Sequence, residues 1–287
     1  MEEIKNLNLK DWPALLRQIP DPPTKLYIRG QLPNPQNYIY LAVVGSRKYS
    51  NYGKEACREL IHGLADYPIA IVSGLALGID SIAHQSALDV GLPTIAVPGS
   101  GLEETVLYPP SNCGLADKIL KNNGCLLSEF EPDFRATPYS FPKRNRLMAG
   151  MSTATLIVEA TEKSGTLITA RLALDYNREV LVVPGPIFNE GSAGTLRLLK
   201  DGARPVIESA DILDALNLKI NDSQKNIVGE DFSETEKNIY DLLMREPLSR
   251  EDILTLAKLP ATEINTALSL LEIKGVIEES GGEFHIS

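Results

Sequence analysis

The sequence predicts a doubly wound α/β fold, in which helices cover both faces of a mostly parallel sheet. One reason is alternation, because short apolar runs and segments with helical spacing follow one another from residue 38 to residue 216. The other reason is that those runs are apolar along almost their whole length. Such strands are typical of parallel sheets that are buried on both faces.

The elements follow from this alternation in chain order. Residues 1–37 are rich in closely spaced prolines, which predicts an irregular N-terminal lead-in with one short helix near residues 14–17. From residue 38 on, apolar runs that end at glycine, proline or serine predict strands, and helical spacing predicts helices. The predicted strands are 38–44, 69–72, 93–97, 125–128, 153–159, 180–183 and 205–207. The predicted helices are 52–66, 76–88, 112–122, 141–151, 166–177, 195–200 and 210–216.

A second, smaller domain is predicted at the C-terminus. Residues 217–231 are polar and lack periodicity, which predicts a linker after the main domain of residues 38–216. Ser233 and Glu236 then form the Ser-x-x-Glu pattern of a capping box at a helix start. The predicted helices are 233–245, 249–257 and 262–274, with a hairpin after them. Three short helices followed by a hairpin predict a winged helix-turn-helix domain over residues 232–287.

Charge is distributed unevenly between these parts. The chain carries a net charge of −10, and residues 230–287 contain 13 acidic against 5 basic residues. The third helix of the predicted winged helix has Lys274 as its only cation and carries Glu263 and Glu272. Insertion into a duplex groove would bring like charges together. We therefore expect this domain to contact protein, or to modulate a binding groove of the main domain, rather than to read DNA sequence.

Composition limits the remaining classes of protein. Apolar residues make up 43% and charged residues 23% of the 287 residues, which is typical of a globular protein and excludes a collagen or a disordered chain. The uncharged stretches are too short to cross a bilayer, and no secretory signal is visible, so we expect a cytoplasmic protein without a membrane partner. Cysteines and histidines are few and dispersed, so neither a metal site nor a cofactor is expected.

The candidate ligand site lies where the predicted strands end, because open α/β sheets bind ligands at the carboxyl ends of their strands. Five of these ends consist of small residues, which let backbone N–H groups approach an anion. Tight turns also need such residues, but five of them on one sheet edge favour an oxyanion or phosphate site. The five are Gly45-Ser46, Ser73-Gly74, Gly99-Ser100-Gly101, Ser164-Gly165-Thr166 and Pro184-Gly185-Pro186. Neither the motif that binds dinucleotides nor the motif that binds nucleoside triphosphates occurs in these loops.

Basic residues narrow the choice of ligand. Arg47 and Lys163 lie in two of the loops, and further cations open a predicted helix directly after two aromatic residues. Cations and exposed rings together are what a single nucleic-acid strand requires. The helix-start residues concerned are Tyr139, Phe141, Lys143, Arg144, Asn145 and Arg146. The alternative is a solvated helix end whose arginines pair with Glu129, Glu131 and Asp133.

One histidine offers a second kind of chemistry. His84 follows Asp80 by four residues, so both lie on one face of a predicted helix. Acid–base catalysis by this pair is conceivable. A structural contact to a loop is the favoured interpretation, because no third catalytic partner is evident.

An ordered series of short motifs extends over residues 12–216. In chain order these are Asp21-Pro22-Pro23, Val43-Val44-Gly45-Ser46-Arg47, Ser73-Gly74-x-Ala76-x-Gly78-x-Asp80-x-x-x-His84, Tyr108-Pro109, Ser128-Glu129, Phe141-Pro142-x-Arg144-Asn145-Arg146, Glu159-Ala160, Ser164-Gly165-Thr166-Leu167-x-Thr169-Ala170 and Pro184-Gly185. The series resembles the DNA-processing protein A (DprA/Smf) family of bacteria. Each motif alone is weak, but the ordered set is specific.

The resemblance implies a non-catalytic recombination mediator with an extended Rossmann-like domain. Such proteins bind single-stranded DNA that enters during natural transformation, or competence, protect it, load the RecA recombinase, and form homodimers through the Rossmann-like domain. The DNA-binding residues that the resemblance implies are Gly45, Ser46, Arg47, Ser73, Gly74, Phe141, Lys143, Arg144, Asn145, Arg146, Lys163, Ser164, Gly165 and Thr166. The chain departs from the family at Leu196, where a polar residue is often found, and its N-terminal segment is short.

Two other functions are weighed against this interpretation. Rossmann-like phosphoribohydrolases of nucleoside monophosphates share the sheet and carry a Gly-Thr-x-x-Glu motif, but here Thr169 stands in place of the glutamate. Threonine can neither act as a general base nor stabilise an oxocarbenium charge. A duplex-binding transcription regulator built on the winged helix is the least supported, because that domain is acidic.

Overall fold

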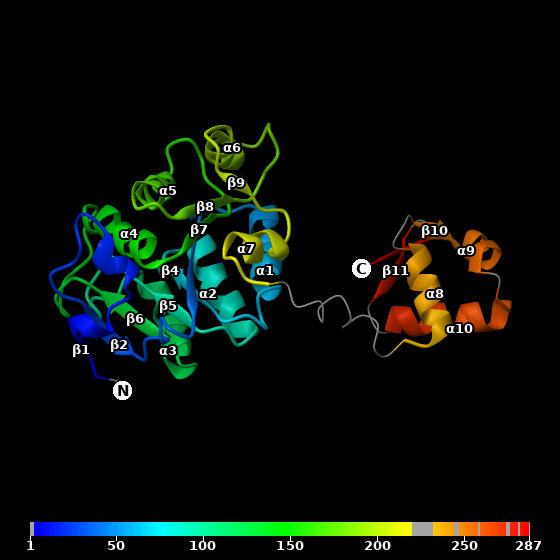
Figure 1. The fold of residues 1–287 in the computed structure, drawn as a ribbon, viewed down its shortest axis with the longest axis horizontal. Helices are drawn as coiled ribbons and strands as arrows, with labels where there is room; N and C mark the ends of the chain where they lie inside the picture. Colours follow the sequence, from blue (N-terminus) through cyan, green and yellow to red (C-terminus); the bar gives the residue numbers. More distant parts are fainter. Residues whose placement is uncertain are drawn as a thin grey trace. The chain divides into compact units, whose positions relative to one another are not determined.

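The structure is a computed structural model that describes residues 3–219, 232–243, 247–257, 259–273, 276–280 and 282–286. The chain divides into two compact units, residues 1–219 and the residues from 220 to the C-terminus (Figure 1). The predicted linker, residues 217–231, lies outside the described residues from position 220 on. None of the described helices is both long and apolar enough to span a membrane.

The first unit is built on one sheet, whose described strands lie in the order β1-β2-β6-β5-β4-β3-β7-β8-β9 (Figure 1). From β6 to β9 all neighbours are parallel, whereas β1 and β2 are antiparallel at one edge. The strands are β1 Lys5–Asn6, β2 Tyr27–Gly30, β3 Ile39–Val44, β4 Ile69–Ser73, β5 Thr94–Ala96, β6 Cys125–Ser128, β7 Ala154–Ile157, β8 Glu179–Val182 and β9 Arg204–Pro205. Strand order reverses between β3 and β7, so the predicted doubly wound α/β fold is confirmed.

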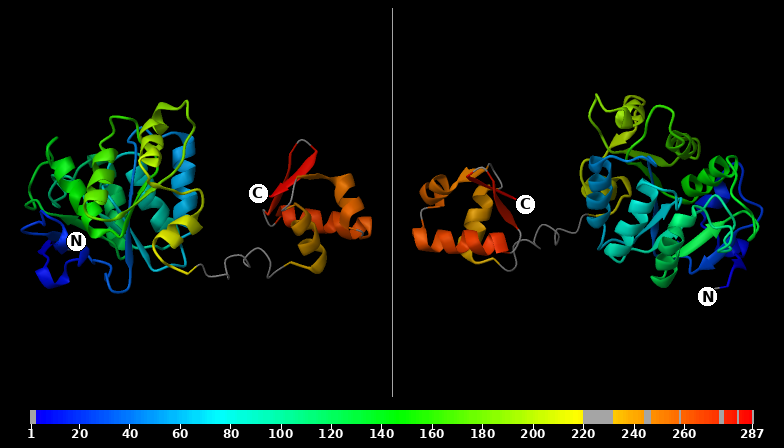
Figure 2. Two further views of the ribbon diagram at one scale, coloured as in Figure 1. Left: turned by 45° about the horizontal axis from the view of Figure 1, so that its top comes forward. Right: turned by 180° about the vertical axis from the view of Figure 1, so that it is seen from behind.

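Helices cover both faces of this sheet (Figure 2). They are α1 Asn51–His62, α2 Ile79–Asp89, α3 Cys113–Lys121, α4 Ser140–Met151, α5 Thr166–Asp175, α6 Ala193–Lys200 and α7 Ser209–Ala215. Successive strand residues point to opposite faces, so Leu41 and Val43 of β3 pack with α1, α2 and α7. Tyr40 and Val44 of the same strand pack in the cluster that holds α4, α5 and α6.

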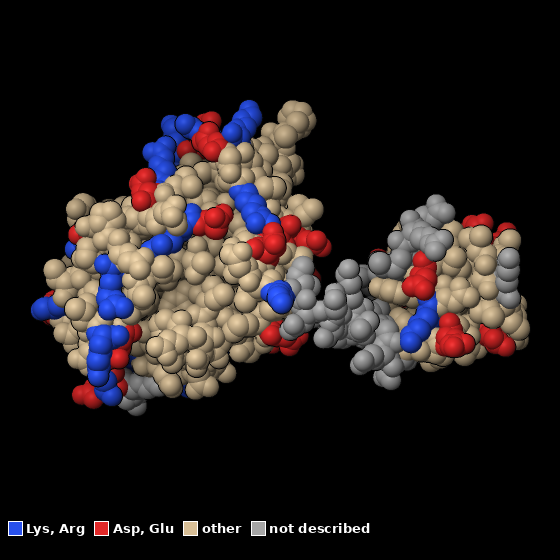
Figure 3. Space-filling view, in the orientation of Figure 1, with Lys and Arg blue, Asp and Glu red and all other residues tan. Residues whose placement is uncertain are grey.

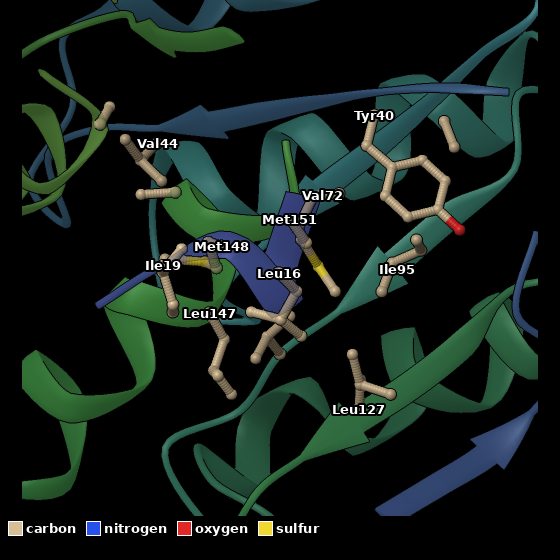
Figure 4. Close-up of a cluster of buried hydrophobic side chains, with 14 of the residues drawn as sticks. Leu16, Ile19, Tyr40, Val44, Val72, Ile95, Leu127, Leu147, Met148 and Met151 are labelled. Atoms are coloured by element: carbon tan, nitrogen blue, oxygen red, sulfur yellow. The ribbon is translucent and has the colours of Figure 1, made fainter. Parts of the chain in front are cut away.

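The N-terminal segment differs from its prediction as an irregular lead-in. Residues 27–30 form β2, which pairs with β6 and extends the main sheet. Leu16 and Ile19 are buried in the cluster that also contains Met148 and Met151 of α4 (Figure 4). The prolines of this segment flank β2 rather than interrupt it, and for this reason their density concealed a strand that belongs to the first unit.

The second unit is a winged helix-turn-helix domain, as predicted. Its helices are α8 Glu234–Leu243, α9 Arg250–Ala257 and α10 Ala261–Ile273, and its strands β10 Leu248–Ser249, β11 Ile277–Ser280 and β12 Glu283–Ile286 pair in the order β10-β12-β11. The predicted capping box forms, because Ser233 N–H donates to the Glu236 carboxylate (2.6 Å) and Glu236 N–H to the Ser233 hydroxyl (3.2 Å). Ile239, Ile264 and Phe284 lie in a separate apolar core.

Candidate nucleic-acid interface

A cavity of about 660 Å³ opens at the carboxyl edge of the sheet. Its lining comes from the loop that follows β3, the start of α2, one face of α4, and the segment that joins β7 to α5. This is the position where strand order reverses, and open α/β sheets bind ligands at such switch points. The lining residues from the predicted site are Gly45, Ser46, Arg47, Phe141, Arg144, Asn145, Ser164, Gly165 and Thr166.

Helix α4 divides its polar residues between two faces. Consecutive helical residues are about 100° apart, so residues at i, i+3, i+4 and i+7 share a face. Phe141, Arg144, Asn145 and Met148 have this spacing, and all of them line the cavity. Lys143 and Arg146 lie on another face.

Arg144 forms part of the cavity floor. Its side chain is buried, 4% exposed, and Nη1 donates a hydrogen bond to the Val97 carbonyl. Burial lowers the pKa of Arg144 to about 10, and the Asp80 carboxylate opposes this shift. Nε is buried and has no hydrogen-bond partner among the described residues. The guanidinium therefore stays charged at neutral pH and retains a donor.

Asp80 is the acidic neighbour of this arginine and lines the same cavity. Its carboxylate accepts the backbone N–H of Gly74 at 3.1 Å, which fixes the turn after β4. Burial raises the pKa of Asp80, while the Arg144 guanidinium, the backbone N–H groups of Ala76 and Gly74, and Arg47 oppose the shift. A carboxylate here thus balances the positive charge of the cavity floor.

Gly78 explains why α2 begins at Ile79, three residues later than predicted. Its φ is +86°, and a Cβ at this position would overlap the backbone of Ser46 and Arg47. Glycine therefore permits the start of α2 to lie against the loop after β3. This contact places Asp80 beside that loop.

Aromatic rings form one wall of the site. Arg47 is exposed, and its Cζ lies 5.2 Å from the centre of the Phe141 ring. Phe141 in turn contacts Tyr108, with ring centres 5.5 Å apart and planes inclined by 53°. A smaller pocket lined by Gly74, Tyr108 and these same groups adjoins the main cavity. Aromatic rings with cations beside them can stack on unpaired bases while the cations contact the backbone.

The loop before α5 contributes small polar residues. The Ser164 hydroxyl accepts the N–H of Thr166 at 3.2 Å and donates to its hydroxyl at 2.9 Å, so the turn is fixed from within. Thr161 and Thr169, which were not predicted, also line the cavity. Lys163 is exposed and is not among the lining residues.

Lys143 and Arg146 do not line the cavity, contrary to the predicted grouping. Arg146 forms a buried ion pair with Glu129 and donates to the Asp21 carbonyl at 2.8 Å. Lys143 Nζ lies 3.5 Å from the same Glu129 carboxylate and 5.5 Å from the Phe130 ring centre. The alternative of arginine–carboxylate pairing therefore holds for Arg146 and Glu129, but this pair is buried and not part of a solvated helix end.

Two further predicted residues have structural roles. The buried Ser73 hydroxyl donates to the Val43 carbonyl at 2.7 Å and does not line the cavity. His84 Nδ1 lies 2.7 Å from the Thr94 hydroxyl, and burial lowers the pKa of His84 to about 3. The structural interpretation of His84 is thus confirmed, with β5 rather than a loop as its partner.

Lys48 and Asp80 line the cavity but were missing from the predicted set. Adjacency to Arg47 indicated Lys48, and Asp80 belongs to the same motif as Ser73 and Gly74. In the view of Figure 3, Lys and Arg side chains lie over α5 and α6 with acidic side chains among them, whereas the charged side chains visible on the second unit are mainly Asp and Glu. Within the described ranges, no group of three or more His, Cys, Asp or Glu side chains could hold a metal ion.

Fold and site together define a Rossmann-like α/β protein with an arginine- and aromatic-lined cavity at its switch point, joined to a winged helix domain. Residues 4–217 match the family model of DNA recombination-mediator protein A, and residues 229–283 match that of the DprA winged helix domain. The chain belongs to the DNA recombination-mediator protein A (DprA/Smf) family, a family of DNA-processing proteins involved in recombination.

Several relatives support this assignment. Protein Smf of Escherichia coli is 38% identical over 284 residues, which cover 95% of this chain and 74% of that protein. DNA processing protein DprA of Streptococcus pneumoniae is 40% identical over 202 residues, 70% of each chain. Its crystal structure superposes with a TM-score of 0.69 over 76% of each chain. A structure of DNA processing protein A from Helicobacter pylori, which describes its single-stranded DNA binding mode, has a TM-score of 0.67, 32% identity, and covers 76% of this chain and 98% of that one.

Proposed function

We propose that this protein binds single-stranded DNA in the switch-point cavity and acts as a recombination mediator. One observation carries the proposal: Arg47, Arg144 and Phe141 line one cavity, and the Arg47 guanidinium lies over the Phe141 ring. Guanidinium groups attract the phosphate backbone, and the rings of Phe141 and Tyr108 offer faces to unpaired bases. A duplex keeps those base faces inside its own stack.

The finer parts of the proposal come from the family. The protein protects single strands that enter the cytoplasm during natural transformation and transfers them to the RecA recombinase, and it works as a homodimer through its Rossmann-like unit. The single-stranded DNA binding described for the Helicobacter pylori relative is consistent with this role. RecA-dependent ATP hydrolysis on single strands coated with single-strand-binding protein tests the loading step, and sedimentation tests the dimer.

The proposed role involves no catalysis. In the alternative, a phosphoribohydrolase, a glutamate would stand where Thr169 lines the cavity. A hydroxyl there supplies neither a general base nor a negative charge for an oxocarbenium ion. Incubation of the protein with nucleoside monophosphates should therefore release no free base, and base release that depends on the cavity residues would contradict the proposal.

DNA binding is tested by fluorescence anisotropy with labelled oligothymidine against a duplex of equal length. We expect preference for the single strand, with a log–log salt slope of about −0.7 per phosphate contacted. Arg47→Ala should weaken binding to every sequence alike and make the slope less steep, because phosphate contacts carry no base information. Lys121→Ala, an exposed cation at the end of α3, is the matched control and should bind like the parent. If Arg47→Ala also binds like the parent, the cavity is not the DNA site.

A further inference from the structure

Exposed apolar side chains lie on the carboxyl edge outside the cavity. Phe188 is 95% and Ile187 74% exposed in the loop that follows β8. Tyr49 and Tyr52, between β3 and the first turn of α1, are 45% and 50% exposed. Together with Lys48 these residues form what we term the aromatic rim. A group of exposed apolar side chains, unlike a single one, marks a surface that contacts another molecule.

A hydrogen bond connects the two segments of the aromatic rim. The Tyr52 hydroxyl donates to the carbonyl of Pro184 at 2.7 Å, which joins the start of α1 to the loop after β8. Ser50 caps α1 by accepting the N–H of Gly53 at 3.0 Å. The rings therefore belong to segments of defined conformation.

Glu159, a buried residue two positions after the end of β7, contacts both segments. Its carboxylate accepts the N–H of Ser50 at 2.9 Å. It also lies so close to Gly53 and Gly191 that a Cβ at either position would overlap it. Ala160 N–H donates to the Gly191 carbonyl at 2.9 Å, which attaches the far end of the loop to the same strand end.

The aromatic rim is continuous with the cavity. Lys48 belongs to both, and Tyr49 follows it directly. On the other side, Thr161 lines the cavity, and its carbonyl lies against Gly194 in the first turn of α6, which follows the loop that carries Phe188. A nucleic-acid strand that leaves the cavity between β3 and β7 would therefore contact the aromatic rim next.

The chemistry of the rim fits the same ligand as the cavity. Exposed Lys48 and Lys54 flank the two tyrosines, so a cation lies on either side of the ring pair along this segment. Rings combined with cations are typical of surfaces that follow a nucleic-acid backbone and stack its bases, whereas protein interfaces are depleted of lysine.

We propose that a single strand leaving the cavity continues over the aromatic rim, with one unpaired base stacked on Phe188 and another on Tyr49. Tyr52 acts as a positioning residue: its hydroxyl donates a hydrogen bond to Pro184 and so holds the loop that carries Phe188 beside the start of α1. This inference rests on the proposed function. It implies that the protein occludes a longer tract of DNA than the cavity alone would hold.

Oligothymidines of increasing length, titrated against the full-length protein, test the inference. Phe188→Ala and Tyr49→Ala should bind the shortest competent oligonucleotide like the parent and bind longer ones about 5-fold or more weakly, because stacking of one base contributes about 1–3 kcal/mol. The salt slope should stay unchanged, since no charge is removed. Phe188→Trp should retain the parent's affinity, and long oligonucleotides should quench its emission.

Leu9→Ala removes another exposed apolar side chain, 62% exposed in the N-terminal segment, and serves as the matched control. If Phe188→Ala and Tyr49→Ala bind every length like the parent while Arg47→Ala loses affinity, the inference is wrong and the proposed function stands. A change in self-association without a change in DNA affinity likewise overturns it, in favour of a protein contact. If the parent binds no oligothymidine, the proposed function itself fails.

Discussion

The guanidinium of Arg144 lies directly against the α-carbon of Gly74, so closely that a methyl group at Gly74 would overlap it. Arg144 comes from α4 and Gly74 from the turn after β4, two segments far apart in the sequence. The same turn donates its N–H to Asp80, the carboxylate that faces this arginine. The position of the buried cation therefore depends on the absence of a side chain at residue 74.

Gly74→Ala should displace the Arg144 side chain without removing its charge. We expect the variant to lose about 1–3 kcal/mol of stability, since the added methyl group overpacks a buried site. Affinity for single-stranded DNA should fall about 10-fold, the usual effect of losing a hydrogen bond to a charged group. Gly114→Ala, in α3 with open space at its Cβ, should keep the parent's affinity and gain a few tenths of a kcal/mol. Thermal unfolding and anisotropy measure both effects, and unchanged DNA affinity of Gly74→Ala would show that this arginine does not contact DNA.

The sequence was sufficient to predict which loops line the cavity but not which of the neighbouring cations do so. Alternating apolar strands and helices placed the loops after β3, β4 and β7 at one edge, and the cavity opens there. Arg144 and Arg146 are only two residues apart, which on a helix means about 200° of rotation. One therefore enters the cavity while the other meets Glu129. Helical spacing from Phe141 would have separated them.

Long-range pairing was the other feature that the sequence did not reveal. Residues 27–30 form a strand only because β6 lies beside them, and four residues between prolines carry no periodicity of their own. Likewise, nothing in the local pattern indicates that Tyr52 donates a hydrogen bond to Pro184. Both contacts depend on the assembled sheet.

Arg146→Ala should affect stability and leave DNA binding of the folded protein unchanged. The substitution leaves Glu129 buried with only Lys143 near its carboxylate, and breaking a buried ion pair costs about 3 kcal/mol. Burial raises the pKa of Glu129, and Arg146 opposes that shift. A raised pKa means that the ionised carboxylate opposes folding at neutral pH and that this penalty disappears as pH falls. The difference in melting temperature from the parent should therefore be largest near pH 7 and shrink towards pH 4.5. A difference that does not depend on pH would contradict this assignment.

His84 should contribute to the acid sensitivity of the first unit. Burial lowers its pKa to about 3 from an ordinary value of 6.5, and the positive charge of Arg144 acts in the same direction. The stability that it contributes is complete above pH 6.5 and is lost as pH falls towards 3, by about 1.4 kcal/mol per pH unit. His84→Gln should unfold with a shallower dependence on pH than the parent over this range. Urea titrations at several pH values measure the two slopes, and parallel slopes would refute the prediction.

The winged helix domain should not bind duplex DNA at moderate salt. Residues 261–272 of α10 include exposed Glu263 and Glu272 and no basic residue, while Lys274 lies outside the described residues. The wing strands add exposed Glu278 and Glu283. Because this domain has its own apolar core, the fragment 230–287 can be tested alone in an electrophoretic shift assay. A shift of duplex DNA would overturn the expectation of a protein-contacting or modulating role.

Asp80→Asn should increase affinity for single-stranded DNA while it lowers stability. Asparagine keeps an oxygen that accepts the N–H of Gly74, so the turn after β4 is retained. The negative charge that faces Arg144 and opposes the phosphate backbone is removed, and we expect several-fold tighter binding at fixed salt. Stability should fall by about 1–3 kcal/mol, because the buried guanidinium loses its counter-charge.

The pH dependence separates this charge effect from a change in shape. Burial raises the pKa of Asp80, so in the parent the carboxylate gains a proton as the solution is acidified, and the cavity becomes more positive. Affinity of the parent should therefore approach that of Asp80→Asn as pH falls, while phosphates remain ionised and every other group titrates alike in both proteins. Anisotropy titrations from pH 7 to pH 4 follow the ratio of the two dissociation constants. A constant ratio would mean that the substitution acts through the geometry of the turn and not through its charge.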